Sequence, residues 1–218
     1  MYYIIGDIHG QIFKLLKLMT MIEEKISDND TIIFLGDYID RGKDSYSVIE
    51  YLSRLSEKYK IFFLKGNHED MFIKYYYTGK GYDLYIRNGG MATIKSYEKA
   101  IGKMKLPEKH KKFFSSLNLF YKGDDFIAVH AGLRPYAGEP VRQKPEDLLW
   151  IREDFFLADY SWDKTIIFGH TPTSFLNNSK RIYFDKKRNI IGIDTGAMYE
   201  DGFLACLRWP DKKIFQVN

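Results

Sequence analysis

The sequence predicts an α/β fold in which two mixed β-sheets pack as a sandwich with helices outside. Three features predict it: strands and helices alternate over residues 1–77, short strands dominate the second half, and polar residues follow the strands directly. The chain has 218 residues, 45% hydrophobic and 28% charged, so it can bury a sizeable core. No low-complexity linker or break in composition divides it. We therefore expect a single domain over residues 1–218.

The first part of the chain alternates between apolar runs and amphipathic segments. The continuous β-branched run TIIFL is typical of a strand buried on both faces. This alternation predicts parallel strands joined by right-handed helical crossovers. The expected strands are YYII (2–5), TIIFL (31–35) and KIFFL (60–64), and the expected helices cover 11–26, 44–57 and 69–77. The predicted inner sides of the first two helices comprise Ile12, Leu15, Leu16, Met19, Ile22 and Ile26, and then Val48, Leu52 and Leu55.

The remainder of the chain changes character twice. Residues 78–118 are rich in glycine and then helical, with no strand signal. Seven short strands with turn signals between them follow, and we expect them to form a second, mixed sheet packed on the first. They are LFYK (119–122), FIAV (126–129), TIIFG (165–169), RIYF (181–184), NIIGI (189–193), FLACLRW (203–209) and KIFQV (213–217).

Composition excludes several classes of protein. The net charge of +4 permits anionic substrates but does not argue for nucleic acid, and the short basic runs at 109–112 and 185–188 are typical of a solvated surface. No apolar stretch reaches membrane-spanning length, and because chemistry-bearing residues begin at Gly6 we expect no signal peptide. The lone Cys206 excludes an internal disulfide and lies in a strand-like run, where a small buried residue is expected. We expect a soluble, cytoplasmic protein with no membrane partner and no specific nucleic-acid partner.

Metal-type side chains follow five apolar runs at the point where each run ends. Four of the five histidines lie in these turns, and only His110 lies elsewhere. Ligands of open α/β sheets bind beyond the carboxyl ends of the strands, so these side chains should converge. Mixed nitrogen and oxygen ligands suit Mn, Fe or Zn, and the set is large enough for two ions about 4 Å apart, a centre that promotes phosphoryl transfer. The candidates are Asp7, His9, Asp37, Asn67, His68, His130 and His170.

Five motifs in order, GDIHG, GDYIDRG, GNHE, HAG and GHTP, resemble those of the calcineurin-like metallophosphoesterases, specifically their phosphoprotein phosphatase branch. The resemblance covers essentially the whole chain and implies a four-layer α/β/β/α arrangement. NGG at 88–90, LLWIRE at 148–153 and the closing IDTGA are similar to compact bacterial and phage serine/threonine phosphatases, such as lambda phage phosphatase. Bacterial diadenosine tetraphosphate hydrolases belong to the same branch.

The resemblance also implies residue roles. His68 would be the general acid that protonates the leaving group, Asp40 would orient it, and Arg41 and Arg152 would bind phosphate oxygens. The implied reaction is direct attack on phosphorus by a hydroxide that bridges two divalent metal ions, with Mn favoured over Fe or Zn. The ions would be held by Asp7, His9 and Asp37, and by Asp37, Asn67, His130 and His170.

Two substrate classes and one remote alternative class of enzyme follow from these motifs. A serine/threonine phosphoprotein or phosphopeptide is favoured, because the related dinucleotide hydrolases are expected to be longer at the C-terminus. A dinucleoside polyphosphate is the alternative, and the segments 78–118 and 133–150 should distinguish the two. Five tyrosines could stack on a purine base, although aromatic residues at helical spacing are more often core: Tyr75, Tyr76, Tyr77, Tyr82 and Tyr85. An aspartic protease is a remote alternative from the DTGA signature, which needs two facing carboxylates. Pro172 stands where many phosphodiesterases carry a second histidine, which disfavours a nuclease.

Overall fold

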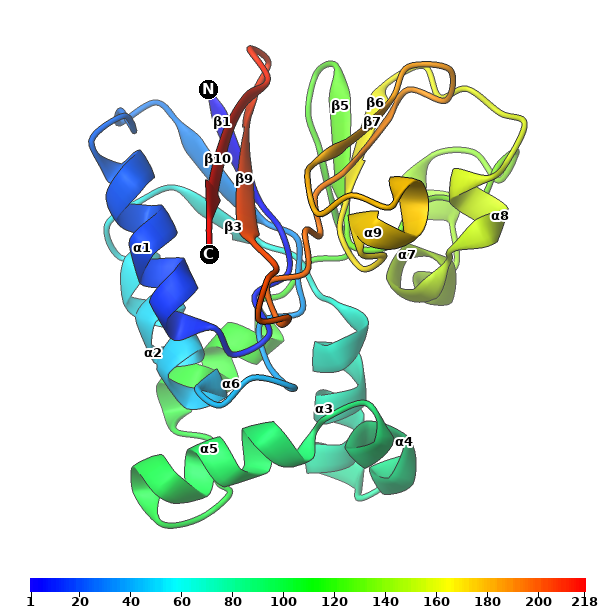
Figure 1. Cartoon of the computed structure of the whole chain (residues 1–218). Coiled ribbons are helices and arrows are strands. Elements are labelled where there is room, and N and C mark those ends of the chain that lie inside the picture. The colour runs from blue at the N-terminus through cyan, green and yellow to red at the C-terminus, as the bar shows by residue number, and fades with distance from the viewer.

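Two five-stranded β-sheets form the centre of the computed structural model, which describes residues 1–218 (Figure 1). The first sheet has the strand order β10-β9-β1-β2-β3 and the second has the order β4-β5-β6-β8-β7. Both sheets are mixed, as predicted. The first comprises β1 (Tyr2–Ile5), β2 (Thr31–Phe34), β3 (Ile61–Phe63), β9 (Leu204–Trp209) and β10 (Lys213–Val217). The second comprises β4 (Phe120–Lys122), β5 (Phe126–Val129), β6 (Thr165–Phe168), β7 (Tyr183–Asp185) and β8 (Ile190–Gly192).

The apolar strands are buried on both faces because each sheet lies between the other sheet and a layer of helices. Successive side chains of a strand point to opposite faces, so Ile4 faces the second sheet while Tyr3 and Ile5 face the helices. The side chains between the sheets form one cluster that includes Ile33, Leu35, Phe126, Ala128, Ile167 and Ile191. This alternation produces the four layers.

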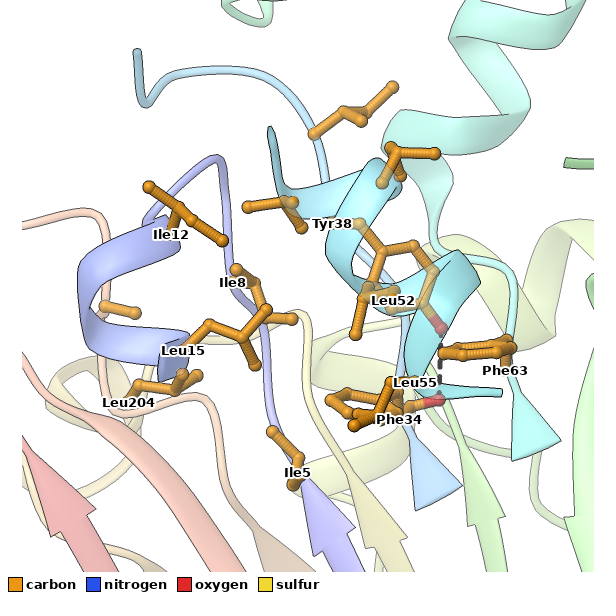
Figure 2. Close-up of a cluster of buried hydrophobic side chains, with 14 of the residues drawn as sticks. Ile5, Ile8, Ile12, Leu15, Phe34, Tyr38, Leu52, Leu55, Phe63 and Leu204 are labelled. Carbon is orange, nitrogen blue, oxygen red and sulfur yellow. Dashed lines mark hydrogen bonds between the residues drawn. The ribbon is translucent and has the colours of Figure 1, made fainter. Parts of the chain in front are cut away.

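Helices α1 (Ile12–Glu23) and α2 (Ser45–Leu55) cover the outer face of the first sheet (Figure 1). Figure 2 shows Leu15 of α1 beside Leu204 of β9, and Leu55 of α2 beside Phe34 of β2. One residue of the predicted stripe is wrong: Leu16 is 39% exposed, whereas Leu18 is fully buried. Leu18 follows Leu15 at an i, i+3 spacing, which places both on the same face of the helix.

The outer face of the second sheet is covered by short elements of the 133–177 region. These are η1 (Pro140–Arg142), α7 (Pro145–Trp150), α8 (Glu153–Phe156) and α9 (Thr173–Asn177). Leu148 of α7 and Phe155 of α8 pack on Val129 and Phe168 of the sheet. This layer therefore brings the LLWIRE segment to the edge of the second sheet.

The last two strands join the first sheet, although all strands after residue 118 were predicted for the second. β9 pairs antiparallel with β1, and Ile5 lies opposite Cys206. Antiparallel and parallel strands have the same apolar patterns when both faces are buried, so the sequence does not reveal which sheet accepts them. Cys206 is buried, as expected.

Four helices fill the segment between β3 and β4. They are α3 (Asn67–Thr78), α4 (Tyr82–Arg87), α5 (Met91–Ile101) and α6 (Glu108–Ser115), and α5 and α6 pack against α2 (Figure 1). The fully buried His110 joins α6 to α5 and α2: its Nδ1 lies 2.8 Å from Tyr97 Oη and its Nε2 lies 3.1 Å from Glu50 Oε2. The one histidine outside the predicted site thus has a structural environment. No helix of the chain combines the length and apolar character needed to cross a membrane.

Candidate active site

The predicted metal-type side chains all lie at the carboxyl ends of the central strands, where the edges of the two sheets meet. Asp7 and His9 follow β1, Asp37 follows β2, and Asn67 and His68 occupy the first turn of α3, directly after β3. His130 follows β5 and His170 follows β6, so both sheets contribute. All seven side chains are at least 95% buried. The expected convergence is therefore present.

Several of these loops hold their side chains with left-handed backbone. Nine non-glycine residues have positive φ, and five of them are His9, Asp37, Asp40, Arg41 and His170. Such conformations are uncommon for residues with a Cβ atom and cluster at functional sites. The local conformation is therefore set by the surrounding loops and not by backbone preference.

Glycines precede these ligands because the neighbouring loop approaches too closely for a Cβ atom. A Cβ at Gly66 would lie 2.1 Å from Oδ1 of Asp37, and one at Gly169 would lie 2.1 Å from Oδ1 of Asp7. The Gly-Asn and Gly-His pairs thus follow from carboxylates that pack against backbone, whereas Gly6 and Gly36 of the Gly-Asp pairs lie against the backbone of Ile193 and Gly66.

One group of ligand atoms surrounds Asn67. Oδ1 of Asn67 lies 3.0 Å from Nε2 of His130 and 3.0 Å from Nδ1 of His170, and Oδ1 of Asp37 lies 3.4 Å from Nε2 of His130. Ligands about 2.1 Å from a shared metal at angles of 90° to 109° are about 3.0–3.4 Å apart, so the spacing fits a coordination sphere. Nδ1 of His130 donates to the carbonyl of Leu35 at 2.9 Å, which leaves Nε2 with a lone pair that faces another acceptor. Nε2 of His130 and Oδ1 of Asn67 could both coordinate a cation placed between them.

A second group lies on the other side of Asp37. Oδ2 of Asp37 is 3.5 Å from Nε2 of His9, whose Nδ1 donates to the carbonyl of Ile39 at 3.0 Å. One carboxylate oxygen of Asp37 therefore faces each group, the geometry of a bridging ligand. His68 also falls within this group, with Nε2 3.9 Å from Oδ2 of Asp37. The Asp7 carboxylate lies nearby and accepts the backbone N–H of His170 at 3.0 Å.

The electrostatics of the cluster fit a bound cation. Burial lowers the pKa of His9, His130 and His170, so these imidazoles are neutral, as metal ligation requires. Burial, Asp194 and Asp37 together raise the pKa of Asp7 well above its usual range. The carboxyl groups of Asp7, Asp37 and Asp194 lie so close together that they can all be ionised only if a positive charge is bound among them. Nε2 of His170 is buried without a hydrogen-bond partner, while its Nδ1 is the nitrogen that faces Oδ1 of Asn67.

His68 and Asp40 form a buried dyad beside this cluster. Nδ1 of His68 lies 2.8 Å from Oδ2 of Asp40, and its Nε2 has no partner. Burial opposes protonation of His68, but the carboxylates of Asp37 and Asp40 outweigh it and raise the pKa. The hydroxyls of Tyr85 and Thr93 donate to Oδ1 of Asp40 at 2.8 and 2.6 Å, so each oxygen of this carboxylate has fixed partners.

Tyr85 and Thr93 are site residues that sequence reasoning missed, although Tyr85 was considered as a wall for a base. Tyr85 is fully buried and stacks on Tyr75 with ring centroids 5.4 Å apart. It is therefore not available to a ligand, whereas Tyr77 and Tyr82 are 58% and 44% exposed. The only sequence signal that could have brought Tyr85 and Thr93 together was the NGG turn between them, because a turn places its flanking segments side by side.

Glu69 is a second residue without a predicted role. Its Oε2 accepts the backbone N–H groups of Asp37 and Gly66 at 2.8 and 3.0 Å, and its Oε1 accepts those of Tyr38 and Ile39 at 2.9 and 3.3 Å. A fully buried carboxylate with four donors fixes the backbone of the loop that carries Asp37 and Asp40. Its place inside the GNHED motif was a signal that it belongs to the site.

The two predicted phosphate-binding arginines lie on opposite flanks of the cluster. Nη1 of Arg41 donates to Nε2 of His9 at 3.2 Å, and Arg41 is exposed. Nη1 of Arg152 donates to the Thr171 hydroxyl at 3.0 Å, beside His170. Asp194, from the DTGA signature, is buried against the same cluster, where burial and Asp37 raise its pKa to about 6. Asp194 thus lies in the turn that follows β8.

The family model for calcineurin-like phosphoesterases matches residues 2–195, a range that includes every residue of this site. The chain belongs to the calcineurin-like phosphoesterase family. This membership implies a dinuclear centre of divalent metal ions, and the two His/Asp groups around Asp37 are suited to it. It also confirms the class of enzyme, a metallophosphoesterase.

Relatives of known name cover nearly the whole chain. The bis(5'-nucleosyl)-tetraphosphatase PrpE [asymmetrical] of Anoxybacillus flavithermus is 28% identical, over 99% of this chain and 93% of its own. A protein proposed to be a diadenosine tetraphosphatase has a solved structure with a TM-score of 0.72 at 21% identity, over 99% of this chain and 92% of its own. A serine/threonine phosphatase of Saccharomyces cerevisiae has a TM-score of 0.61 at 18% identity, over 99% of this chain and 78% of its own. These two structures share the fold.

Proposed function

We propose that the chain is a metal-dependent hydrolase of dinucleoside polyphosphates, working as a single catalytic domain over residues 1–218. The observation that carries the chemistry is Asp37, with one carboxylate oxygen facing each ligand group at 3.5 and 3.4 Å. Arginines flank this centre on both sides, which suits bidentate capture of phosphate oxygens. A cytoplasmic location belongs to the same proposal and is supported by the unpaired, buried Cys206.

The proposed ligands divide at Asp37. Mn is the proposed metal, with Fe and Zn as alternatives for this mixed set of nitrogen and oxygen ligands. When bound, two such ions would supply an activated water and neutralise charge on the phosphate. Asp7, His9 and Asp37 would hold one ion, and Asp37, Asn67, His130 and His170 the other.

The other residues act on the substrate directly. Arg41 and Arg152 would hold the attacked phosphate from opposite flanks. Water attacks phosphorus and gives up a proton to solvent, the bond between phosphorus and the leaving oxygen breaks, and Nε2 of His68 donates its proton to that oxygen. His68 then regains a proton from solvent. Asp40 holds Nδ1 of His68 at 2.8 Å, so that the unpartnered Nε2 is directed to the substrate.

The substrate class rests on the relatives. The sequence favoured a phosphoprotein because dinucleotide hydrolases were expected to be longer, yet the PrpE relative is covered over 93% of its length. Length therefore no longer disfavours a dinucleotide, and a relative with this name supports it. A phosphoprotein remains the second candidate, supported by the fold shared with a yeast serine/threonine phosphatase.

The deciding experiment compares kcat/KM of Mn-loaded protein on diadenosine tetraphosphate and on a phosphoserine/phosphothreonine peptide. Asp37→Asn and a chelated sample serve as controls. A higher kcat/KM on the dinucleotide is the expected result, and a preference for the peptide would transfer the function to the second candidate. No metal-dependent turnover of either substrate would refute both.

A further inference from the structure

A basic groove of ≈ 530 Å³ opens beside the catalytic loop, outside the metal-type cluster. Its lining includes four cationic side chains, those of Arg41, Lys43, Lys95 and Lys99, and no carboxylate. None of the three lysines makes an ion pair, whereas Lys111 pairs with Glu108 and Lys122 pairs with Glu139 elsewhere on the surface. Unpaired like charges repel one another, so the empty groove has a cost that an anion would relieve.

The groove is continuous with the site because Arg41 belongs to both. Nη1 of Arg41 lies 3.2 Å from Nε2 of His9, within the cluster, and the same side chain lines the groove. A phosphate held by Arg41 at the cluster would therefore direct any further phosphates of the same chain along the groove.

The lysines of the groove are held in a fixed relation to the catalytic loop. Helix α5 carries Lys95 and Lys99 on its exposed face, about 6 Å apart along the helix axis. The buried face of α5 is bonded to the loop through the Thr93 hydroxyl, which donates to Asp40, and the N–H of Arg41 donates to the carbonyl of Gly89 just before the helix. The position of the lysines is therefore preorganised, which lowers the entropy lost when an anion binds.

The opposite flank has the reverse charge. The hollow beside Arg152, of ≈ 390 Å³, is lined by four carboxylates, those of Glu146, Asp147, Glu153 and Asp154. Its second arginine, Arg134, already pairs with Asp147 and Asp154 at 2.7 and 3.1 Å. A polyanion on that side would meet repulsion, so an extended substrate has one favourable direction.

We propose that the groove along α5 is a subsite for the polyphosphate arm of the substrate, the phosphates beyond the one attacked. The assignment rests on the proposed hydrolysis of dinucleoside polyphosphates and adds a direction to it. The attacked phosphate lies between Arg41 and Arg152, its polyphosphate neighbour extends past Lys43 to Lys95 and Lys99, and the less charged arm lies toward Arg152.

The test compares Lys95→Ala/Lys99→Ala with a matched control, Lys186→Ala/Lys213→Ala, which removes two exposed lysines that do not line the groove. Inorganic tripolyphosphate and orthophosphate are each titrated as inhibitors of p-nitrophenyl phosphate hydrolysis, with metal in excess of all phosphate. Both inhibitors can occupy the position of the attacked phosphate, so a change that affects only this position cancels in the ratio of their inhibition constants. In the groove variant, we expect the inhibition constant of tripolyphosphate to rise roughly tenfold relative to that of orthophosphate, because two exposed charge pairs are lost. The control variant should show no such rise.

An unchanged ratio in the groove variant would overturn the subsite, as would an equal change in the control. The same variants are then assayed on diadenosine tetraphosphate, where a raised KM with little change in kcat is expected. If the wild-type protein does not hydrolyse this dinucleotide while the inhibition ratio still shifts, the proposed function fails and the polyphosphate site stands. The two failures are thus distinguishable.

Discussion

Replacing Glu69 by Gln tests whether this buried carboxylate holds the catalytic loop. The carboxylate accepts four backbone N–H groups, two on each oxygen. An amide keeps one oxygen and turns an NH₂ donor toward the other two N–H groups, so two charge-assisted bonds are lost. At about 1.5–3 kcal/mol each, the expected destabilisation is about 3–6 kcal/mol. For a chain of this size that corresponds to a fall in Tm of about 6–24 °C.

Burial and the carboxylate of Asp37 raise the pKa of Glu69 to about 8 in the metal-free protein. Thermal unfolding of that protein is therefore followed by circular dichroism above pH of about 8, where the carboxylate is charged and bound ions make no contribution. Glu98→Gln is the matched control, because Glu98 is exposed on α5 and its side chain makes no hydrogen bond or ion pair. A Tm within 2 °C of wild type for Glu69→Gln, or an equal fall for Glu98→Gln, would refute the reasoning.

Three further outcomes are expected. Asp37→Asn should lower the bound metal, measured by elemental analysis, from two ions to at most one, because the bridging oxygen is lost. His68→Asn should retain both ions and lose about 10²- to 10⁴-fold in kcat on a substrate with a poor leaving group, and much less on p-nitrophenyl phosphate. For His110, burial lowers the pKa, so protonation favours the unfolded state. The difference in free energy of unfolding between wild type and His110→Gln should therefore have its full value above pH of about 6.5 and decrease as the pH falls below it.

Each of these outcomes has a clear contrary. Two ions retained by Asp37→Asn would show that Asp37 does not bridge. An equal loss on both leaving groups for His68→Asn would indicate a role other than proton donation. For the His110 variant, the measurement is urea unfolding at several pH values. If the difference in free energy of unfolding from wild type did not depend on pH, the titration of the buried imidazole would not contribute to stability.

The sequence predicted the parts of the molecule that local pattern determines. Apolar runs marked the central strands, and the polar residues at their ends marked the cluster, because parallel strands bring their carboxyl ends to one edge. It did not predict that β9 lies beside β1 or that Tyr85 reaches Asp40. These contacts join segments 200 and 45 residues apart, and no periodicity relates their partners. Substrate choice was also beyond the motifs, because the motifs resemble those of phosphoprotein phosphatases and of dinucleotide hydrolases alike.

The placement of the ligands in loops of both sheets has a consequence for the lifetime of the protein. Under the proposed assignment, an ion bound by Asp37 on one side and by His130 and His170 on the other cross-links two halves of the fold that otherwise adhere through apolar side chains. At a metal concentration 100 times Kd, one such site adds about 2.7 kcal/mol to the free energy of unfolding. Metal starvation would therefore do more than stop turnover. It would lower the free energy of unfolding and raise the fraction of chain accessible to proteases, so that the abundance of the enzyme follows the supply of its metal.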